Sequence, residues 1–316
     1  MAESAPRPQA FYKKRVARIV PSYYFAVLVI FLFIALPTGA YASIKEALTD
    51  LLSTLTFTQV FFPGVLLATR IDGVLWTAAI EMQFYLLFPL LAWCFRKHPL
   101  VTYLGMVAVS MVYLFGFAVK DPDRLRLTLN QLPGFFGVFA NGMLFALVYV
   151  WLSQRLVRSA PLSIAATLVA VASLFVIFEL EKAVPRTDPV QLWQATYRYR
   201  MSLLFALFSV SAALSAKWFR FLFSNAVARF LSLVSYNLYI WHQWIFVKLK
   251  EWRIPYWSGD TAPNFTGDRA WQWKYTLLAL AVSLAMAALT TYLVERPAAN
   301  KLLTHHVKEK PHAPSV

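Results

Sequence analysis

Long apolar runs alternate with short polar or basic segments along most of the chain. A run of about 18 or more apolar residues can cross the hydrocarbon core of a membrane as a helix. We therefore predict an all-α, polytopic membrane helix bundle of about eight transmembrane helices. The predicted spans are Val20–Leu36, Val74–Phe95, Leu100–Val119, Leu132–Trp151, Ile164–Phe178, Met201–Ala216, Phe230–Val247 and Tyr275–Val294.

One further apolar stretch, Leu51–Ala68, is ambiguous. It contains four Ser or Thr residues, a Gln and the pair Pro63–Gly64. These residues favour a re-entrant or surface-lying segment over a spanning helix. If the stretch does span, the bundle has about nine transmembrane helices.

The composition agrees with a membrane protein. The chain is 59% hydrophobic and only 14% charged, whereas about a quarter of the residues in a soluble domain are charged. The net charge of +15 fits cytoplasmic loops that face anionic headgroups, and no pattern typical of nucleic-acid binding is visible. Lys and Arg are denser on the inside if both termini are cytoplasmic, so we predict that orientation.

The chain is predicted to have three parts. Residues 1–18 form a basic cytoplasmic N-terminal segment, 19–297 form the membrane domain, and 298–316 form a basic disordered tail. The tail histidines (His305, His306 and His312) are interpreted as solvated. The single cysteine, Cys94, excludes a disulfide framework within the chain and a Cys-based zinc cluster. We expect no metal site and no bound cofactor.

Two ionisable residues lie inside predicted spans, and they are the candidates for chemistry. Glu81 and His242 lie at similar depth near the outer ends of their spans. An ionisable residue in a membrane is a functional-site hypothesis by default. A carboxylate beside an imidazole could relay a proton or fix the imidazole tautomer. A structural hydrogen bond between helices explains the pair equally well.

Further polar and aromatic residues lie on the same helix faces. By helical spacing Tyr85 shares a face with Glu81, Tyr239 shares one with His242, and Trp241 shares another with Asn237. Asn141 is a polar residue in the middle of a fourth span. Together they suggest a hydrated substrate cavity. Hydrogen bonding that holds the helices together is the alternative.

Arg15 and Arg18 precede the first span within FYKKRVARIVPSYY. Residues three apart on a helix face the same way, so two guanidinium groups could clamp a phosphate or pyrophosphate. Basic residues that merely anchor the span in its orientation produce the same pattern. Spacing alone favours anchoring.

Five segments, taken in order, resemble a known family. FYKKRVARIVPSYY, LWTAAIEMQFYLLFPLL, FANGMLFA, SYNLYIWH and YLVERPAAN are similar to successive motifs of the bacterial membrane acyltransferases called acyltransferase family three. Each motif alone is weak. Their common order and spacing over residues 11–300 make the resemblance specific.

The resemblance implies an O-acyltransferase of the bacterial inner membrane. It implies transfer of an acyl group, often acetyl, from acyl-CoA to a hydroxyl of a surface polysaccharide, another glycan or a small molecule. Arg15 and Arg18 then become acyl-CoA candidates. Glu81 matches the family's acidic position and His242 its histidine, and both are predicted to be catalytic. Trp76 matches a family tryptophan and joins Tyr85, Asn141, Tyr239 and Trp241 as a predicted cavity residue.

One departure bears on catalysis. The family opens with two additional spans, the first of which carries the histidine usually assigned as catalytic, whereas this chain begins at the arginine segment. Three explanations are therefore expected: a truncated gene model, a partner subunit that supplies these helices, or catalysis by His242 and Glu81. A non-catalytic truncated homologue is an alternative, and so is a transporter or flippase for a lipid-linked sugar.

Overall fold

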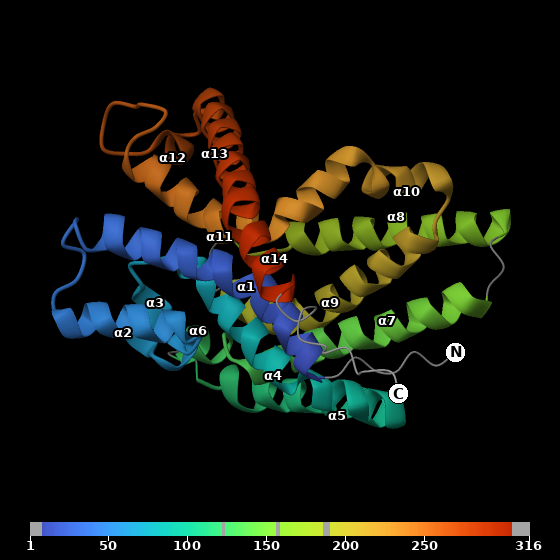
Figure 1. Cartoon of the computed structure of the whole chain (residues 1–316). Coiled ribbons are helices and arrows are strands. Elements are labelled where there is room, and N and C mark those ends of the chain that lie inside the picture. Colours follow the sequence, from blue (N-terminus) through green and yellow to red (C-terminus); the bar gives the residue numbers. More distant parts are fainter. Residues whose placement is uncertain (1–7, 122–123, 156–158, 186–189, 305–316) are drawn as a thin grey trace, which may run out of the picture. The chain divides into compact units, whose positions relative to one another are not determined.

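The computed structural model describes residues 8–121, 124–155, 159–185 and 190–304. Within these ranges every regular element is a helix, which confirms the all-α prediction. The chain forms two compact units, which are described one at a time (Figure 1). The terminal unit contains Met1–Ala79 and Phe230–Val316, and the central unit contains Ile80–Arg229.

The terminal unit is built mainly from three long helices that have shorter helices beside them. Helix α1 packs against the last turns of the chain, η7 and α14. Ser43 begins α2 and Asp268 begins α13, because each side chain accepts a bond from a backbone N–H of the first turn. Its elements are α1 (Pro8–Ile30), η1 (Phe31–Ala35), α2 (Ile44–Leu55), η2 (Gln59–Phe61), α3 (Pro63–Ala68), η3 (Gly73–Leu75), α11 (Ala226–Glu251), α12 (Pro263–Thr266), α13 (Arg269–Thr290), η7 (Thr291–Glu295) and α14 (Arg296–Thr304).

The central unit is a bundle in which α8 packs along α9, and α7 packs on α5 and α9 (Figure 1). The Phe84 and Phe139 rings stack with their centres 3.7 Å apart and join α4 to α7. Helix α4 begins in the terminal unit and continues into the central one. The elements are α4 (Trp76–Lys97), α5 (Pro99–Met111), η4 (Val112–Ala118), α6 (Leu125–Thr128), η6 (Leu132–Phe135), α7 (Phe136–Arg155), α8 (Ala160–Lys182), α9 (Val190–Leu214) and α10 (Lys217–Ser224).

The number of candidate membrane spans is smaller than predicted. Six helices in the described part of the chain are long and apolar enough to cross a membrane, and a bent pair, α9 with α10, raises the number to seven. The predicted span Phe230–Val247 lies in α11, which has 26 residues but is not among the candidates. Polar residues such as Asn237, His242 and Gln243 interrupt its apolar character. The predicted span Met201–Ala216 is part of α9, which begins earlier and then bends by 114° into α10.

The ambiguous stretch Leu51–Ala68 does not form one helix. It divides into the end of α2, η2 and α3, with Phe57 in a left-handed conformation between them (φ 58°). The break precedes Pro63, which occupies the first turn of α3, where proline is tolerated. The preference for a segment that is not a spanning helix is therefore confirmed.

The helices at both ends of the predicted membrane domain extend beyond its boundaries, while the three-part division of the chain stays a prediction. Residues 8–18 are helical and continuous with the first span, so that Pro8–Ala35 forms one run of 28 residues. Residues 298–304, predicted to begin a disordered tail, belong to α14. His305, His306 and His312 lie outside the described residues.

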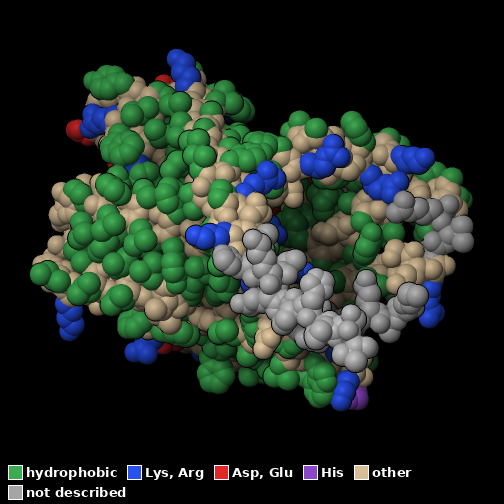
Figure 2. Space-filling view, in the orientation of Figure 1, with side chains coloured by type: hydrophobic (Ala, Val, Ile, Leu, Met, Phe, Trp, Pro, Cys, Tyr) green, Lys and Arg blue, Asp and Glu red, His purple; other side chains and the backbone are tan. Residues whose placement is uncertain are grey.

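The described surface is strongly apolar, as a membrane environment requires. Leu168, Phe175 and Phe178 on α8 are each at least 60% exposed. Figure 2 shows hydrophobic side chains over much of the face in view, with Lys and Arg at scattered positions. Because large apolar side chains on this scale are unfavourable in water, the surface supports an integral membrane protein.

Candidate functional site

The two predicted donor-binding arginines lie one turn apart on α1. The Arg15 guanidinium lies 5.4 Å from the centre of the Phe11 ring. Arg18 is exposed and interacts electrostatically with Glu295. The helical geometry assumed for the pair is confirmed, and binding of a phosphate by the pair stays a prediction.

Glu295 connects this arginine end to a buried amide on α11. The Asn237 Nδ2 group donates to Glu295 Oε2 at 2.6 Å and to Thr291 Oγ1 at 2.8 Å. Asn237 is completely buried, and both of its N–H bonds are used. Hydrogen bonds from Asn237 therefore link α11 to η7, and the Arg18 charge on α1 attracts the Glu295 carboxylate.

Trp241 packs one turn further along α11, on the same face as Asn237. Its side chain is buried, and Nε1 donates to Thr290 Oγ1 at 3.0 Å. The ring meets Phe25 of α1 edge-on, with ring centres 6.4 Å apart. These contacts hold α1, α11 and α13 together, while the cavity role of Trp241 stays a prediction.

His242 lies on a neighbouring face of α11, and its ring nitrogen Nδ1 is fixed by the backbone. Nδ1 lies 2.7 Å from the Tyr239 carbonyl oxygen. A carbonyl can only accept, so Nδ1 carries the hydrogen of this bond, and Nε2 is then the basic nitrogen of the neutral ring. The Tyr239 hydroxyl lies 2.6 Å from the Thr77 hydroxyl at the start of α4, next to the half-buried Trp76. Parts of two sequence motifs therefore meet within the terminal unit.

Glu81 lies on the central-unit part of α4. The Tyr85 hydroxyl, one turn later on the same helix, donates to Glu81 Oε1, so the predicted shared face is confirmed. Glu81 and His242 belong to different units. Their predicted pairing therefore stays a prediction.

Asn141 is buried in the central unit at a junction of three helices. Its Oδ1 accepts from the Tyr103 hydroxyl at 3.0 Å, and its Nδ2 donates to Ser202 Oγ at 2.8 Å. The Tyr103 and Tyr199 hydroxyls lie 2.7 Å apart. These bonds join α5, α7 and α9, as expected if Asn141 holds the helices together. Its role in a substrate cavity stays a prediction.

Two buried carboxylates that the sequence did not single out lie in the terminal unit, Asp50 within α2 and Asp72 just before η3. Asp50 accepts bonds from the Tyr41 and Thr69 hydroxyls and from the Arg70 backbone N–H, at 2.8 to 2.9 Å. Burial, together with the Asp50 charge, raises the pKa of Tyr41. Asp72 Oδ1 accepts from the Val74 N–H at 3.2 Å. Burial raises the pKa of Asp72 to about 7, although the bond from Val74 opposes the shift.

Sequence reasoning missed Glu295, Asp50 and Asp72 as site residues. Glu295 lies within the last of the five motifs, YLVERPAAN, so the motif itself was the available signal. Asp50 and Asp72 resemble ordinary loop and capping residues, and only the fold shows that each is at least 94% buried. Among the described residues no group of three or more His, Cys, Asp or Glu could hold a metal ion.

Comparisons with known proteins agree with these motifs. Residues 7–294 match a family described as an acyltransferase domain. A protein of Acidianus two-tailed virus, named "Putative acetyltransferase ORF330", is 22% identical over 240 residues. The alignment covers 73% of this chain but 64% of the viral protein, so the chain spans less than two thirds of that relative's length. No solved structure matches the chain. Since the family match covers nearly the whole sequence, the chain belongs to the acyltransferase domain family known as acyltransferase family three.

Proposed function

We propose that this protein is an integral-membrane O-acyltransferase that uses acyl-CoA, with acetyl-CoA as the simplest donor. The acceptor is a hydroxyl of a surface polysaccharide, another glycan or a small molecule. The protein lies in the bacterial inner membrane with both termini in the cytoplasm, where acyl-CoA is available. Membership of the acyltransferase family and the apolar helices support this proposal.

The donor binds at the arginine end of α1. Arg15 and Arg18 are one turn apart, and a guanidinium binds phosphate through paired, charge-assisted hydrogen bonds. Glu295 interacts with Arg18 and is itself bonded to Asn237. The Glu295 carboxylate therefore attracts the Arg18 guanidinium toward η7.

His242 acts as the general base, and its hydrogen bond to the backbone is the observation that carries this role. Because Nδ1–H donates to the Tyr239 carbonyl, Nε2 is left to take the proton of the acceptor hydroxyl. The acceptor oxygen forms a bond to the thioester carbonyl carbon, and the carbon–sulfur bond breaks. The CoA thiolate leaves and takes up a proton, so charge and atoms balance.

Thiol release from acetyl-CoA tests the proposal. The protein is reconstituted in nanodiscs made from native lipid extract, which supplies endogenous acceptors, and free thiol is measured over time. His242→Gln keeps a polar side chain of similar size but loses the base, so we expect thiol release to fall by about a hundredfold or more. His98→Gln is the matched control, because His98 is exposed at the start of α5.

Two results would contradict parts of this proposal separately. Wild-type protein that releases no more thiol than empty nanodiscs would exclude the acyltransferase activity under these conditions. A His242→Gln variant as active as the wild type would leave the activity but remove His242 as its base.

A further inference from the structure

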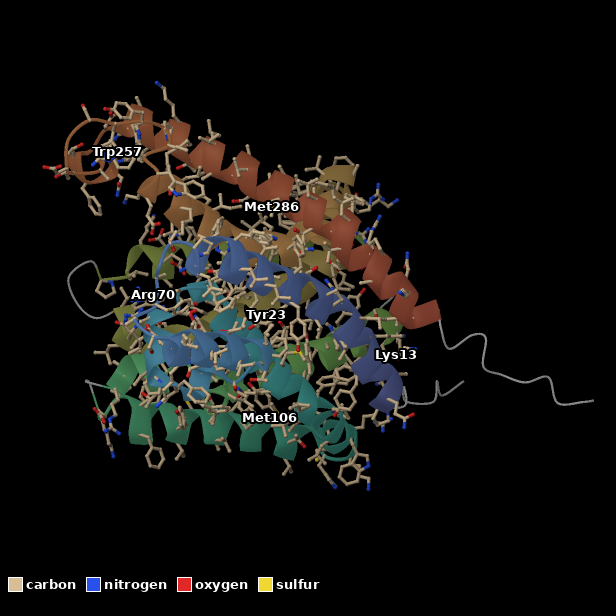
Figure 3. All side chains as sticks on the ribbon, turned by 60° about the vertical axis from the view of Figure 1, so that its left-hand side comes forward. Lys13, Tyr23, Arg70, Met106, Trp257 and Met286 are labelled. Atoms are coloured by element: carbon tan, nitrogen blue, oxygen red, sulfur yellow. The ribbon has the colours of Figure 1, made fainter. Side chains whose placement is uncertain are left out.

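A small polar cavity lies in the terminal unit, formed by the end of the first span, the start of η3 and the last turns of α11. Its volume is about 270 Å³, at the small end of the usual range for ligand pockets. In Figure 3, Lys13, Tyr23 and Arg70 lie in that order along the terminal unit, and Arg70 lines this cavity. The cavity therefore lies far from the basic start of α1, where the acyl-CoA arginines are.

Two residues of this cavity have buried polar atoms that the protein does not satisfy. Asp72 is 6% exposed, and within the described chain nothing donates to its Oδ2. The indole Nε1 of Trp244 is also buried and has no acceptor among the described residues. Both residues line the cavity. An unsatisfied buried polar atom destabilises the folded protein, so each of these two atoms gains from a ligand that pairs with it.

The chemistry of the lining selects the kind of ligand. Asp72 Oδ2 needs a donor, whereas Trp244 Nε1 needs an acceptor, and a hydroxyl group provides both. The charges around the cavity are mixed, because Arg70 and Lys248 are balanced by Asp72 and Glu251, and Lys248 is already paired with Glu251 at 2.6 Å. The balanced charges give neither an anion nor a cation a net attraction that would offset the loss of its hydration, so a neutral molecule fits best.

We propose that this cavity binds a compact, uncharged polyhydroxy molecule, of the size of one sugar ring, through Asp72 and Trp244. The assignment of this ligand rests on the proposed function: the cavity is the site for the hydroxyl-bearing part of the acyl acceptor. Asp72 Oδ2 accepts a hydrogen bond from a ligand hydroxyl, and Trp244 Nε1 donates to a ligand oxygen. The small volume excludes a long glycan chain from the cavity and admits one terminal unit of it.

The test is direct binding of D-glucose, used as a neutral polyhydroxy probe, to the whole protein in nanodiscs without acetyl-CoA. Saturation-transfer NMR follows the probe, so the measurement does not depend on acyl transfer. We expect saturable binding that becomes about tenfold weaker in Asp72→Asn, which replaces the Oδ2 acceptor with an amide donor, and in Trp244→Phe, which removes the indole N–H donor. Asp260→Asn and Trp273→Phe are the matched controls, because both residues are exposed in the same unit.

A third variant covers the case in which either substitution disturbs folding. Gly73 lines the cavity, and a Cβ added there would lie 3.4 Å from Gln243 Nε2, an ordinary contact. Gly73→Ala should therefore fold normally and weaken glucose binding by narrowing the cavity. Wild-type protein that shows no saturable glucose binding would overturn the proposal, and so would three variants that all bind like the wild type. Absence of thiol release from acetyl-CoA would instead count against the acyltransferase function alone.

Discussion

Arg15 and Arg18 show how far a single pair of residues can be interpreted from sequence. Their spacing predicted a shared helix face, and α1 provides it. What the spacing could not show is that Arg18 interacts with Glu295, which lies 277 positions later in the chain. The choice between phosphate binding and anchoring is made by measuring donor affinity.

The arginine pair leads to a prediction about donor affinity. Replacing both residues with Ala should weaken acetyl-CoA binding by about tenfold or more, because each guanidinium can make charge-assisted bonds to a phosphate. Isothermal titration of the nanodisc-embedded protein measures the dissociation constant. Lys14→Ala is the control, since Lys14 is exposed on the same helix. If the double variant binds acetyl-CoA as tightly as the wild type, the arginines only anchor the helix.

His242 is a second residue for which the structure adds detail that the sequence does not contain. The sequence identified it as a polar residue at helical spacing from Tyr239, and the structure adds a bond from Nδ1 to the Tyr239 carbonyl. The tautomer follows from that bond, because a carbonyl has no hydrogen to give. No pattern of residue types could have determined which ring nitrogen carries the hydrogen.

At the scale of elements, three spans contain a π-helical turn: η1 follows α1, η4 follows α5 and η7 follows α13. Such turns are rare in proteins, but those that do occur are often found at functional sites. Here η7 carries Thr291 and Glu295, both of which accept hydrogen bonds from Asn237. The turn therefore belongs to the polar connection between α11 and the end of the last span.

This connection predicts a loss of stability. Asn237→Ala removes the hydrogen bonds that Asn237 donates to Thr291 and Glu295, and it leaves these two oxygen atoms without that donor. We therefore expect the free energy of unfolding to fall by about 1–3 kcal/mol. The thermal unfolding midpoint in detergent should fall measurably. Asn264→Ala should leave it unchanged, because Asn264 is exposed on α12. Equal midpoints for Asn237→Ala and the wild type would show that the network contributes little to stability.

At the scale of the whole molecule, the described surface is suited to lipid. Asp72 differs from that surface, because it is a buried carboxyl among the polar groups at one end of its terminal unit. Because burial raises the pKa of Asp72 to about 7 from 3.8, the folded protein holds this proton more tightly than the unfolded chain does. The free energy of unfolding should therefore decrease as pH rises from about 4 to about 7. The other charged groups that line the same cavity are Arg70, Lys248 and Glu251.

Thermal midpoints measured across this pH range test the assignment. The wild type should lose stability between about pH 5 and pH 7, and Asp72→Asn should lose less, because it has no proton to release there. Asp260→Asn controls for the general effect of removing a carboxylate from the same unit. The same pH profile for Asp72→Asn and the wild type would show that another group is responsible.

The sequence by itself determined the environment and the class of fold. An apolar run long enough to span a membrane has to form a helix, because each backbone N–H and C=O group in lipid must be hydrogen-bonded within its own segment. Five ordered motifs also determined the family, later confirmed by the match over residues 7–294. Both conclusions depend on local composition and order along the chain, which a sequence displays directly.

Only the tertiary structure decided which polar residues meet. Glu295 approaches Asn237 and Arg18, Tyr239 approaches Thr77, and Asp72 shares a cavity with Trp244, although each set is far apart in sequence. The structure also showed that α9 bends sharply into α10. Burial and pairing depend on how distant segments pack, and periodicity within one helix carries no information about its neighbours.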